Sequence, residues 1–365
     1  MKEASNVGIW GIGTHLPPNV RTNDWWPKEL VEQWRERRAA GVTRPVEADR
    51  QLSPAAAALT RAMAAYKEDP FEGAIERRVL SDDMDPSDME LGAAREALAR
   101  SGAFAEDIDA LLIGGTIPDF QQNSSGCRLH RELEMRPGVL TLQTEGTCNA
   151  FAQQVAVARA LIGSGQARRV LAVQSSAQSR VLRAQDPFSV WFGDGATAVV
   201  LGPVPAGEGM LGEAHLTDGR FYGALVTGVP GKRWTDEGKN VLYLADPRRA
   251  REQLFAIAEH ANPMLDRALA AAGLGRKDIG VIVTHQAAGW FGSAIQAIWD
   301  LPEARRTDTF AWASSLSGAN LPMVMATGER EGILRPGDVV ATVSGATGMT
   351  MTVMVMRWRR YRTSS

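Results

Sequence analysis

The sequence predicts an α/β protein made of two related β/α halves. Two pairs of segments repeat at nearly the same spacing along the chain: residues 87–114 resemble residues 265–284, and residues 162–201 resemble residues 333–356. In the first pair, a helix, a glycine-containing turn, an Asp-Ile pair and an apolar strand follow one another. Self-similarity at a fixed spacing is the signature of an internal duplication. The strands are almost continuously apolar, which is typical of sheets covered on both faces.

The N-terminal half begins with a predicted strand over residues 7–12, which Gly13 and the Pro17-Pro18 turn terminate. A predicted helix over residues 87–101 and a strand over residues 110–114 continue this half. A Pro/Gly-rich stretch at residues 202–209 marks the boundary between the halves. We therefore predict an N-terminal half over residues 1–205 and a C-terminal half over residues 206–365.

Residues 22–72 form an insert in the N-terminal half. Its first polar residues can cap a short helix that carries Trp25, Trp26 and Trp34, and residues 53–66 are Ala-rich and helical by propensity. Because neighbouring tryptophans are costly to leave in water, we expect the insert to cover or line part of the molecule.

The composition excludes several classes of protein. The chain has 365 residues, 44% of them hydrophobic, and a formal net charge of −2, so no strong field favours nucleic acid or an anionic membrane. Two cysteines give no disulfide framework and indicate a reducing compartment. No apolar run reaches the 18 residues of a membrane span. We expect a cytoplasmic globular protein with neither a nucleic-acid nor a membrane partner.

Cys148 lies between the apolar run at residues 139–142 and a predicted helix over residues 153–161. A thiol at the start of a helix is expected to have a lowered pKa, because the helix dipole stabilises the thiolate. A thiolate is the nucleophile that thioester exchange needs. The alternative is a buried structural cysteine, since free cysteine is among the most buried residue types.

His285 follows the predicted strand over residues 281–284 of the second half. Ligands of α/β sheets bind at the carboxyl ends of strands. A duplicated fold therefore offers a route that brings His285 and Cys148, which follows a strand of the first half, into one site.

Six segments resemble ketoacyl-ACP synthase III and its acyltransferase relatives from secondary metabolism, which belong to the thiolase superfamily. They lie in the family's order: residues 11–23, 74–78, 147–151 (Thr-Cys-Asn-Ala-Phe), 192–200 (Phe-Gly-Asp-Gly-Ala-Thr-Ala-Val-Val), 284–287 (Thr-His-Gln-Ala) and 315–322, with a closing glycine-rich loop at residues 344–351. The resemblance implies a thiolase fold with α/β/α/β/α layers and a homodimer that pairs through the first-half sheet.

The resemblance also implies roles for individual residues. Cys148 would take an acyl group from acyl-CoA or an acyl carrier protein, and His285 would polarise a carbonyl or move a proton on the second substrate. The backbone N–H groups of Cys148 and Gly348 would form the oxyanion hole.

Cys127 and His130 have the spacing of half a metal site, but no second pair accompanies them, so we expect no metal. The resemblance implies no cofactor, because CoA or phosphopantetheine enters as part of the thioester substrate. The Phe-Gly-Asp-Gly segment at residues 192–195 is expected to be a structural turn around Asp194.

The sequence departs from the family where an Asn is expected and Ser315 stands. The family's Asn and His donate hydrogen bonds to the thioester oxygen of a decarboxylating malonyl unit, and a serine has only one donor. We therefore predict transfer of the acyl group to a small-molecule or carrier-bound alcohol, amine or thiol, with His285 as base oriented by Ser315. Decarboxylative condensation is the alternative, and a non-catalytic partner subunit of a synthase pair is the third. Trp290 stands where the family has an Arg for docking the carrier or CoA.

Overall fold

Two five-stranded sheets form the centre of the computed structural model, which describes residues 6–42 and 52–359. The first sheet has the order β1 (Asn6–His15), β7 (Asp194–Val204), β6 (Val170–Ala177), β4 (Ala110–Gly115) and β5 (Leu140–Gln143). The second has the order β8 (Gly209–Thr217), β14 (Thr350–Arg357), β13 (Val339–Ala346), β11 (Ile279–Thr284) and β12 (Arg305–Arg306).

The two sheets repeat one topology. In each sheet the first, second and third strands of the order pair antiparallel with one another in turn. The third, fourth and fifth strands are parallel. β4 and β11, and likewise β6 and β13, occupy equivalent places, which are the places of the sequence segments that resemble each other. The chain passes from the first sheet to the second between β7 and β8.

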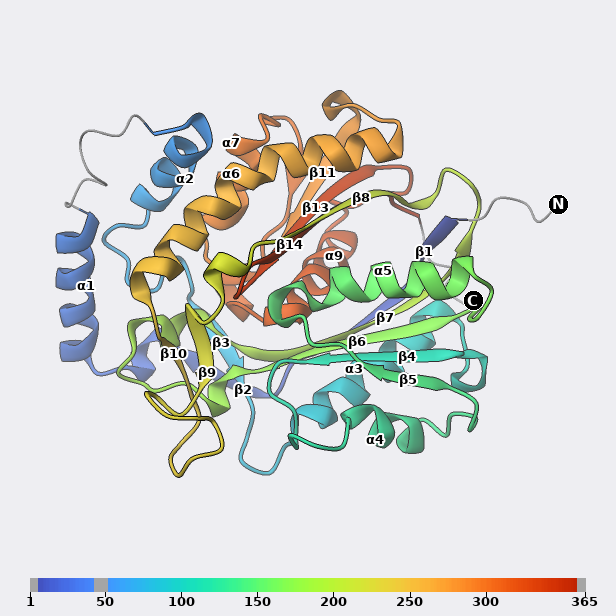
Figure 1. Cartoon of the computed structure of the whole chain (residues 1–365), viewed down its shortest axis with the longest axis horizontal. Coiled ribbons are helices and arrows are strands. Elements are labelled where there is room, and N and C mark those ends of the chain that lie inside the picture. Colours follow the sequence, from blue (N-terminus) through green and yellow to red (C-terminus); the bar gives the residue numbers. More distant parts are fainter. Residues whose placement is uncertain (1–5, 43–51, 360–365) are drawn as a thin grey trace.

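Helices cover both outer faces and fill the space between the sheets, so the molecule has five α/β/α/β/α layers (Figure 1). One outer layer holds α3 (Pro86–Ser101) and α4 (Ser125–Glu132), the middle layer α5 (Ala150–Gly163) and α9 (Asn320–Arg330), and the other outer layer α6 (Pro247–Ala272) and α7 (Phe291–Ile298). Each outer helix layer packs on its sheet through a separate apolar cluster, and a third cluster fills the middle layer between the two sheets. The predicted layered thiolase-type fold is confirmed.

The middle layer joins the halves. Val155 of α5 and Leu321 of α9 are both fully or almost fully buried and lie in one cluster with Val199 of the first sheet and Val281 of the second. The buried residues of α5, Val155 among them, face the sheets, while residues 159–160 lie on the side that remains partly exposed.

The insert packs on the second half rather than on the sheet of its own half. Its helices are α1 (Lys28–Val42) and α2 (Pro54–Ala64), and residues 43–51 of the predicted insert lie outside the described residues. Trp26 and Trp34 are buried in the cluster that contains α6 and α7, so the expectation of a covering role is confirmed for them. Trp25 lies in a 3₁₀ turn and is half exposed.

Smaller elements complete the chain. These are two two-stranded antiparallel sheets, β2 (Asn19–Thr22) with β3 (Glu76–Val79) and β9 (Leu225–Gly228) with β10 (Val241–Leu244), and the short helix α8 (Phe310–Ala313). Within the described ranges, no helix combines the length and the apolar character needed to cross a bilayer.

Candidate active site

Cys148 lies on a tight turn between β5 and α5. The turn is a single 3₁₀ turn over Thr147–Asn149, and α5 continues directly from it. Thr147 has φ = +43°, an uncommon conformation for a β-branched residue. The hydroxyl of Ser344 on β13 donates a 2.6 Å hydrogen bond to the carbonyl oxygen of Cys148. The second half of the chain therefore holds the turn of the first half in place.

The thiol of Cys148 lies beside a serine of the second half. Its Sγ is 3.6 Å from Oγ of Ser317, which is in turn 2.8 Å from Oγ1 of Thr116. The residue is half-buried, and burial of the thiol raises its pKa although the hydrogen bond from Ser317 opposes this. The prediction of a lowered thiol pKa is wrong, because removal of the sulfur from water outweighs the stabilisation that the helix start provides.

Four of the eight non-glycine residues with positive φ in the described ranges lie on this turn or on segments next to it. Besides Thr147, they are Ser314, Ser317 and Met349. Each such residue costs roughly 1–3 kcal/mol and persists only where the surrounding structure enforces it. Strain gathered at one place is typical of a functional site.

His285 approaches the same strand, β13, from the end of β11. Its backbone N–H donates to the carbonyl oxygen of Val343 at 2.9 Å, and the next residue, Ser344, is the one that binds Cys148. The imidazole is 5% exposed, and burial lowers its pKa to about 4. His285 is therefore neutral at physiological pH.

Asn320, at the first position of α9, fixes the imidazole. Its Oδ1 accepts the backbone N–H of Leu316 at 2.9 Å, which leaves the amide nitrogen to face Nδ1 of His285 at 2.9 Å and Oγ of Ser315 at 3.2 Å. Because the amide nitrogen is a donor, Nδ1 of His285 acts as the acceptor. The proton of the neutral imidazole is therefore on Nε2.

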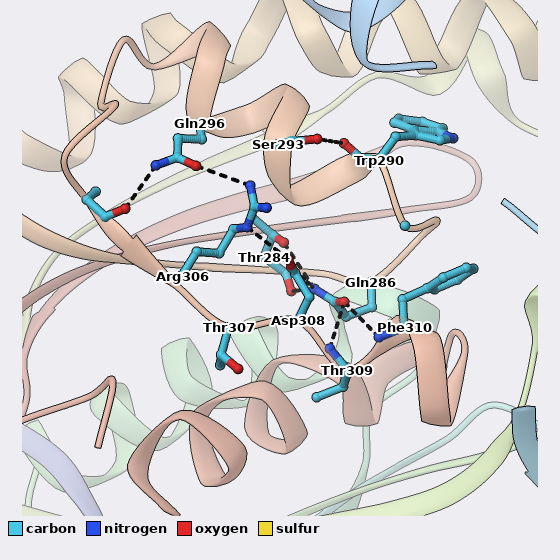
Figure 2. A network of polar contacts seen from close by, with 12 residues as sticks. Thr284, Gln286, Trp290, Ser293, Gln296, Arg306, Thr307, Asp308, Thr309 and Phe310 are labelled. Atoms are coloured by element: carbon cyan, nitrogen blue, oxygen red, sulfur yellow. Dashed lines mark hydrogen bonds and ion pairs between the residues drawn. The ribbon is translucent and has the colours of Figure 1, made fainter. Parts of the chain in front are cut away.

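Gln286, next to His285, ties the end of β11 to the segment that leads to Ser315 (Figure 2). Its Nε2 donates to the carbonyl oxygen of Thr284 at 3.2 Å and to Asp308 at 3.3 Å. Its Oε1 accepts the backbone N–H groups of Thr309 at 3.1 Å and Phe310 at 3.2 Å. With every polar atom of this amide satisfied in a buried place, Gln286 has a structural role.

The remaining predicted residues lie around the same site. Ser315 is 2% exposed and touches Asn320, while the orienting contact to His285 comes from Asn320 and not from Ser315 as predicted. Gly348 has φ = +77° in the β13–β14 turn, and a methyl group built on it meets no described atom within 4 Å.

Asp194 confirms the expected structural turn. Its carboxylate accepts the backbone N–H groups of Leu80 at 2.8 Å and Ser179 at 3.0 Å, and its side chain is fully buried. Burial raises the pKa of this carboxyl, which the hydrogen bonds from Ser179 partly offset.

Comparison with known proteins agrees with this arrangement. A family model described as 3-oxoacyl-[acyl-carrier-protein (ACP)] synthase III matches residues 142–219, and its C-terminal counterpart matches residues 269–358. A β-ketoacyl-[acyl-carrier-protein] synthase III of Cereibacter sphaeroides is 33% identical over 297 residues, which are 78% of this chain and 88% of the relative. The chain belongs to the ketoacyl-ACP synthase III family.

Solved structures of this family superpose over nearly the whole chain. The 3-oxoacyl-(acyl carrier protein) synthase III, FabH, of Pseudomonas aeruginosa is 25% identical, with a TM-score of 0.76 over 97% of this chain and 99% of that one. The priming β-ketosynthase of the R1128 polyketide biosynthetic pathway shares the fold at 20% identity, with a TM-score of 0.78 over 99% of this chain and 98% of that one.

Trp290, which stands where the resemblance places a docking Arg, is buried in this synthase III family member. Trp290 is 4% exposed, and its indole N–H donates to Glu72 of the insert at 2.8 Å. Glu72 also forms an ion pair with Arg38 of α1. Position 290 therefore holds the insert and presents no charge to a substrate.

Proposed function

We propose that this ketoacyl-ACP synthase III family member works by a ping-pong mechanism, in which Cys148 carries the acyl group of an acyl-CoA or acyl-carrier-protein thioester. One observation supports this most directly. The strained Cys148 turn of the first half and His285 of the second half both bind to strand β13. The turn contacts Ser344, and His285 contacts the adjacent residue Val343.

In the loading step, the sulfur of Cys148 attacks the thioester carbonyl, and the bond between that carbon and the donor sulfur breaks. The thiol proton leaves with the donor sulfur, so the step is neutral overall. Ser317 lies at 3.6 Å from the thiol and can pass the proton on. The negative oxygen of the intermediate needs hydrogen-bond donors, and the backbone N–H groups of Cys148 and Gly348 are the proposed ones.

For the second step, the hydrogen bonds of His285 favour a carbon acceptor. A malonyl thioester loses CO₂, its electron pair becomes an enolate, and the enolate carbon attacks the acyl carbonyl and releases the sulfur of Cys148. The enolate oxygen needs donors, and the N–H at Nε2 of His285 is one. Transfer to an alcohol, amine or thiol is the second candidate, which Ser315 in place of the family's Asn favours.

We further propose that the protein is a homodimer that pairs through β5. This strand lies at the edge of the first sheet, and its side chains Leu140 and Leu142 are 49% and 40% exposed. An apolar edge strand left unpaired is an aggregation hazard, which pairing with a second copy removes.

Intact-mass measurement after incubation with a panel of acyl-CoAs tests the loading step. We expect an increment of one acyl group that is lost in Cys148→Ala and kept in the matched control Cys127→Ala, because Cys127 is exposed and lies in α4. No increment with any donor would instead support a non-catalytic partner subunit.

Addition of malonyl-CoA to the loaded enzyme then separates the two acceptors. Release of CO₂ with a β-keto product supports condensation. A loaded enzyme that ignores malonyl thioesters but transfers its acyl group to an alcohol, amine or thiol contradicts it.

A further inference from the structure

We propose that Asn320 is a positioning residue that makes His285 and Ser315 a pair of hydrogen-bond donors toward the reacting thioester. The inference rests on the proposed function and deepens its second step. It concerns an exchange within the 315–322 motif, where the family has Asn first and Ser five residues later, and this chain has Ser315 first and Asn320 five residues later.

The direction of every hydrogen bond around Asn320 follows from one unambiguous donor. The backbone N–H of Leu316 can only donate, so the atom 2.9 Å from it is the amide oxygen of Asn320. The amide nitrogen has two hydrogens, and two acceptors face it, Nδ1 of His285 and Oγ of Ser315. All polar atoms of this fully buried side chain are thus used, which leaves no second orientation of equal energy.

The consequence for the two partners is the same. His285 accepts at Nδ1 and therefore keeps its hydrogen on Nε2. Ser315 accepts at Oγ and therefore keeps its O–H free to donate. Among the described residues no carboxylate contacts His285, so nothing acidic holds a hydrogen on Nδ1. The exchange of Ser and Asn places the amide on the Nδ1 side of the imidazole. The N–H at Nε2 of His285 and the O–H of Ser315 remain as the two donors.

A general base needs the opposite arrangement. For His285 to accept a proton at Nε2, its hydrogen must move to Nδ1 and find an acceptor there. Among the described residues the group that contacts Nδ1 is the amide of Asn320, and turning its Oδ1 toward His285 breaks the bond to Leu316. The arrangement therefore suits stabilisation of an oxyanion and opposes removal of a proton from an alcohol or amine.

The substitution Asn320→Asp reverses the hydrogen bond between residue 320 and His285, because a carboxylate can only accept from Nδ1. One carboxylate oxygen keeps the backbone N–H of Leu316, and the other accepts from Nδ1 of His285, as in a triad whose acid fixes the imidazole as a base. We expect the condensation rate of the loaded enzyme to fall roughly a hundredfold, the usual loss for one oxyanion donor. Hydrolysis of the Cys148 acyl thioester is expected to rise, because Nε2 is then able to activate water.

Solid-state ¹⁵N NMR of histidine-labelled protein reads the tautomer directly. The chain has five histidines, and the His285 signals are assigned by their loss in His285→Gln. We expect a protonated Nε2 and an unprotonated Nδ1 in the wild type, and the reverse in Asn320→Asp, with the other four histidines unchanged as internal controls. A wild-type His285 with its hydrogen on Nδ1 would overturn the inference, even if the Asp variant fails to fold.

A double substitution tests whether the exchange itself matters. Asn320→Ser is expected to lower condensation by roughly a hundredfold, and adding Ser315→Asn to it is expected to recover at least about tenfold, because an amide donor returns beside the imidazole. Equal rates for the single and the double variant contradict the donor-pair arrangement. Failure of the proposed function has a different signature, since then the wild type forms no acyl thioester at all, whatever the tautomer of His285.

Discussion

Burial of His285 makes the stability of this protein depend on pH in a way that one substitution isolates. The pKa of the imidazole falls from its ordinary 6.5 to about 4 in the folded chain. Between these two values the unfolded chain binds a proton that the folded chain does not bind, so stability falls as the pH decreases. With 1.36 kcal/mol per pKa unit, the loss contributed by this residue is about 2 kcal/mol at pH 5 and about 3 kcal/mol at pH 4.

The assay is urea unfolding of the wild type and His285→Gln, followed by circular dichroism at several pH values from 7 to 4. Glutamine does not titrate and offers an acceptor to Asn320, and the other buried acids are common to both proteins. We expect the wild type to lose about 2 kcal/mol more than the variant between pH 7 and pH 5. Parallel stability curves for the two proteins would refute the claim that His285 is buried and neutral.

Three further predictions concern other parts of the molecule. Because burial raises the thiol pKa of Cys148, iodoacetamide at pH 7 is expected to label the exposed Cys127 first. Labelling of Cys148 is expected to become faster as the pH rises, which peptide mapping measures. Labelling of Cys148 before Cys127 argues against this. Leu142→Lys on the edge strand is expected to shift the protein from dimer to monomer in analytical ultracentrifugation, and an unchanged mass contradicts pairing through β5. Gly13→Ala places a methyl group 2.0 Å from a carbonyl of α3 and is expected to cost about 2 kcal/mol or more in thermal unfolding, whereas Gly163→Ala, which meets no described atom within 4 Å, is expected to be tolerated.

The sequence was sufficient for the layered fold and for the elements next to which Cys148 and His285 lie. Periodicity and the repeated Asp-Ile segments predicted an internal duplication. In agreement with it, the two five-stranded sheets have equivalent strand orders. The place of Cys148 before α5 followed from the apolar run and the helix that flank it. These features depend on local pattern, which a single sequence contains.

The electrostatics of the site did not follow from the sequence. The pKa of Cys148 depends on how much water the folded chain removes from the thiol, and local sequence does not contain that quantity. The partner of His285 was assigned to Ser315 by motif register, whereas Asn320 makes the contact because the first turn of α9 points its amide back at the imidazole. The Asn at position 320, five residues after Ser315, is the signal in the sequence that could have indicated this contact.

The repeated strand order limits how this protein can be divided. The sulfur comes from one half and the imidazole from the other, while α5 and α9 share a single apolar cluster between the sheets. A cut in the connection between β7 and β8 would leave each fragment with one reactive group. It would also expose to water the part of the apolar cluster between the sheets that each fragment contributes. Under the proposed mechanism, neither fragment alone would then acquire an acyl group and pass it on, and co-expression of both would be required to restore turnover.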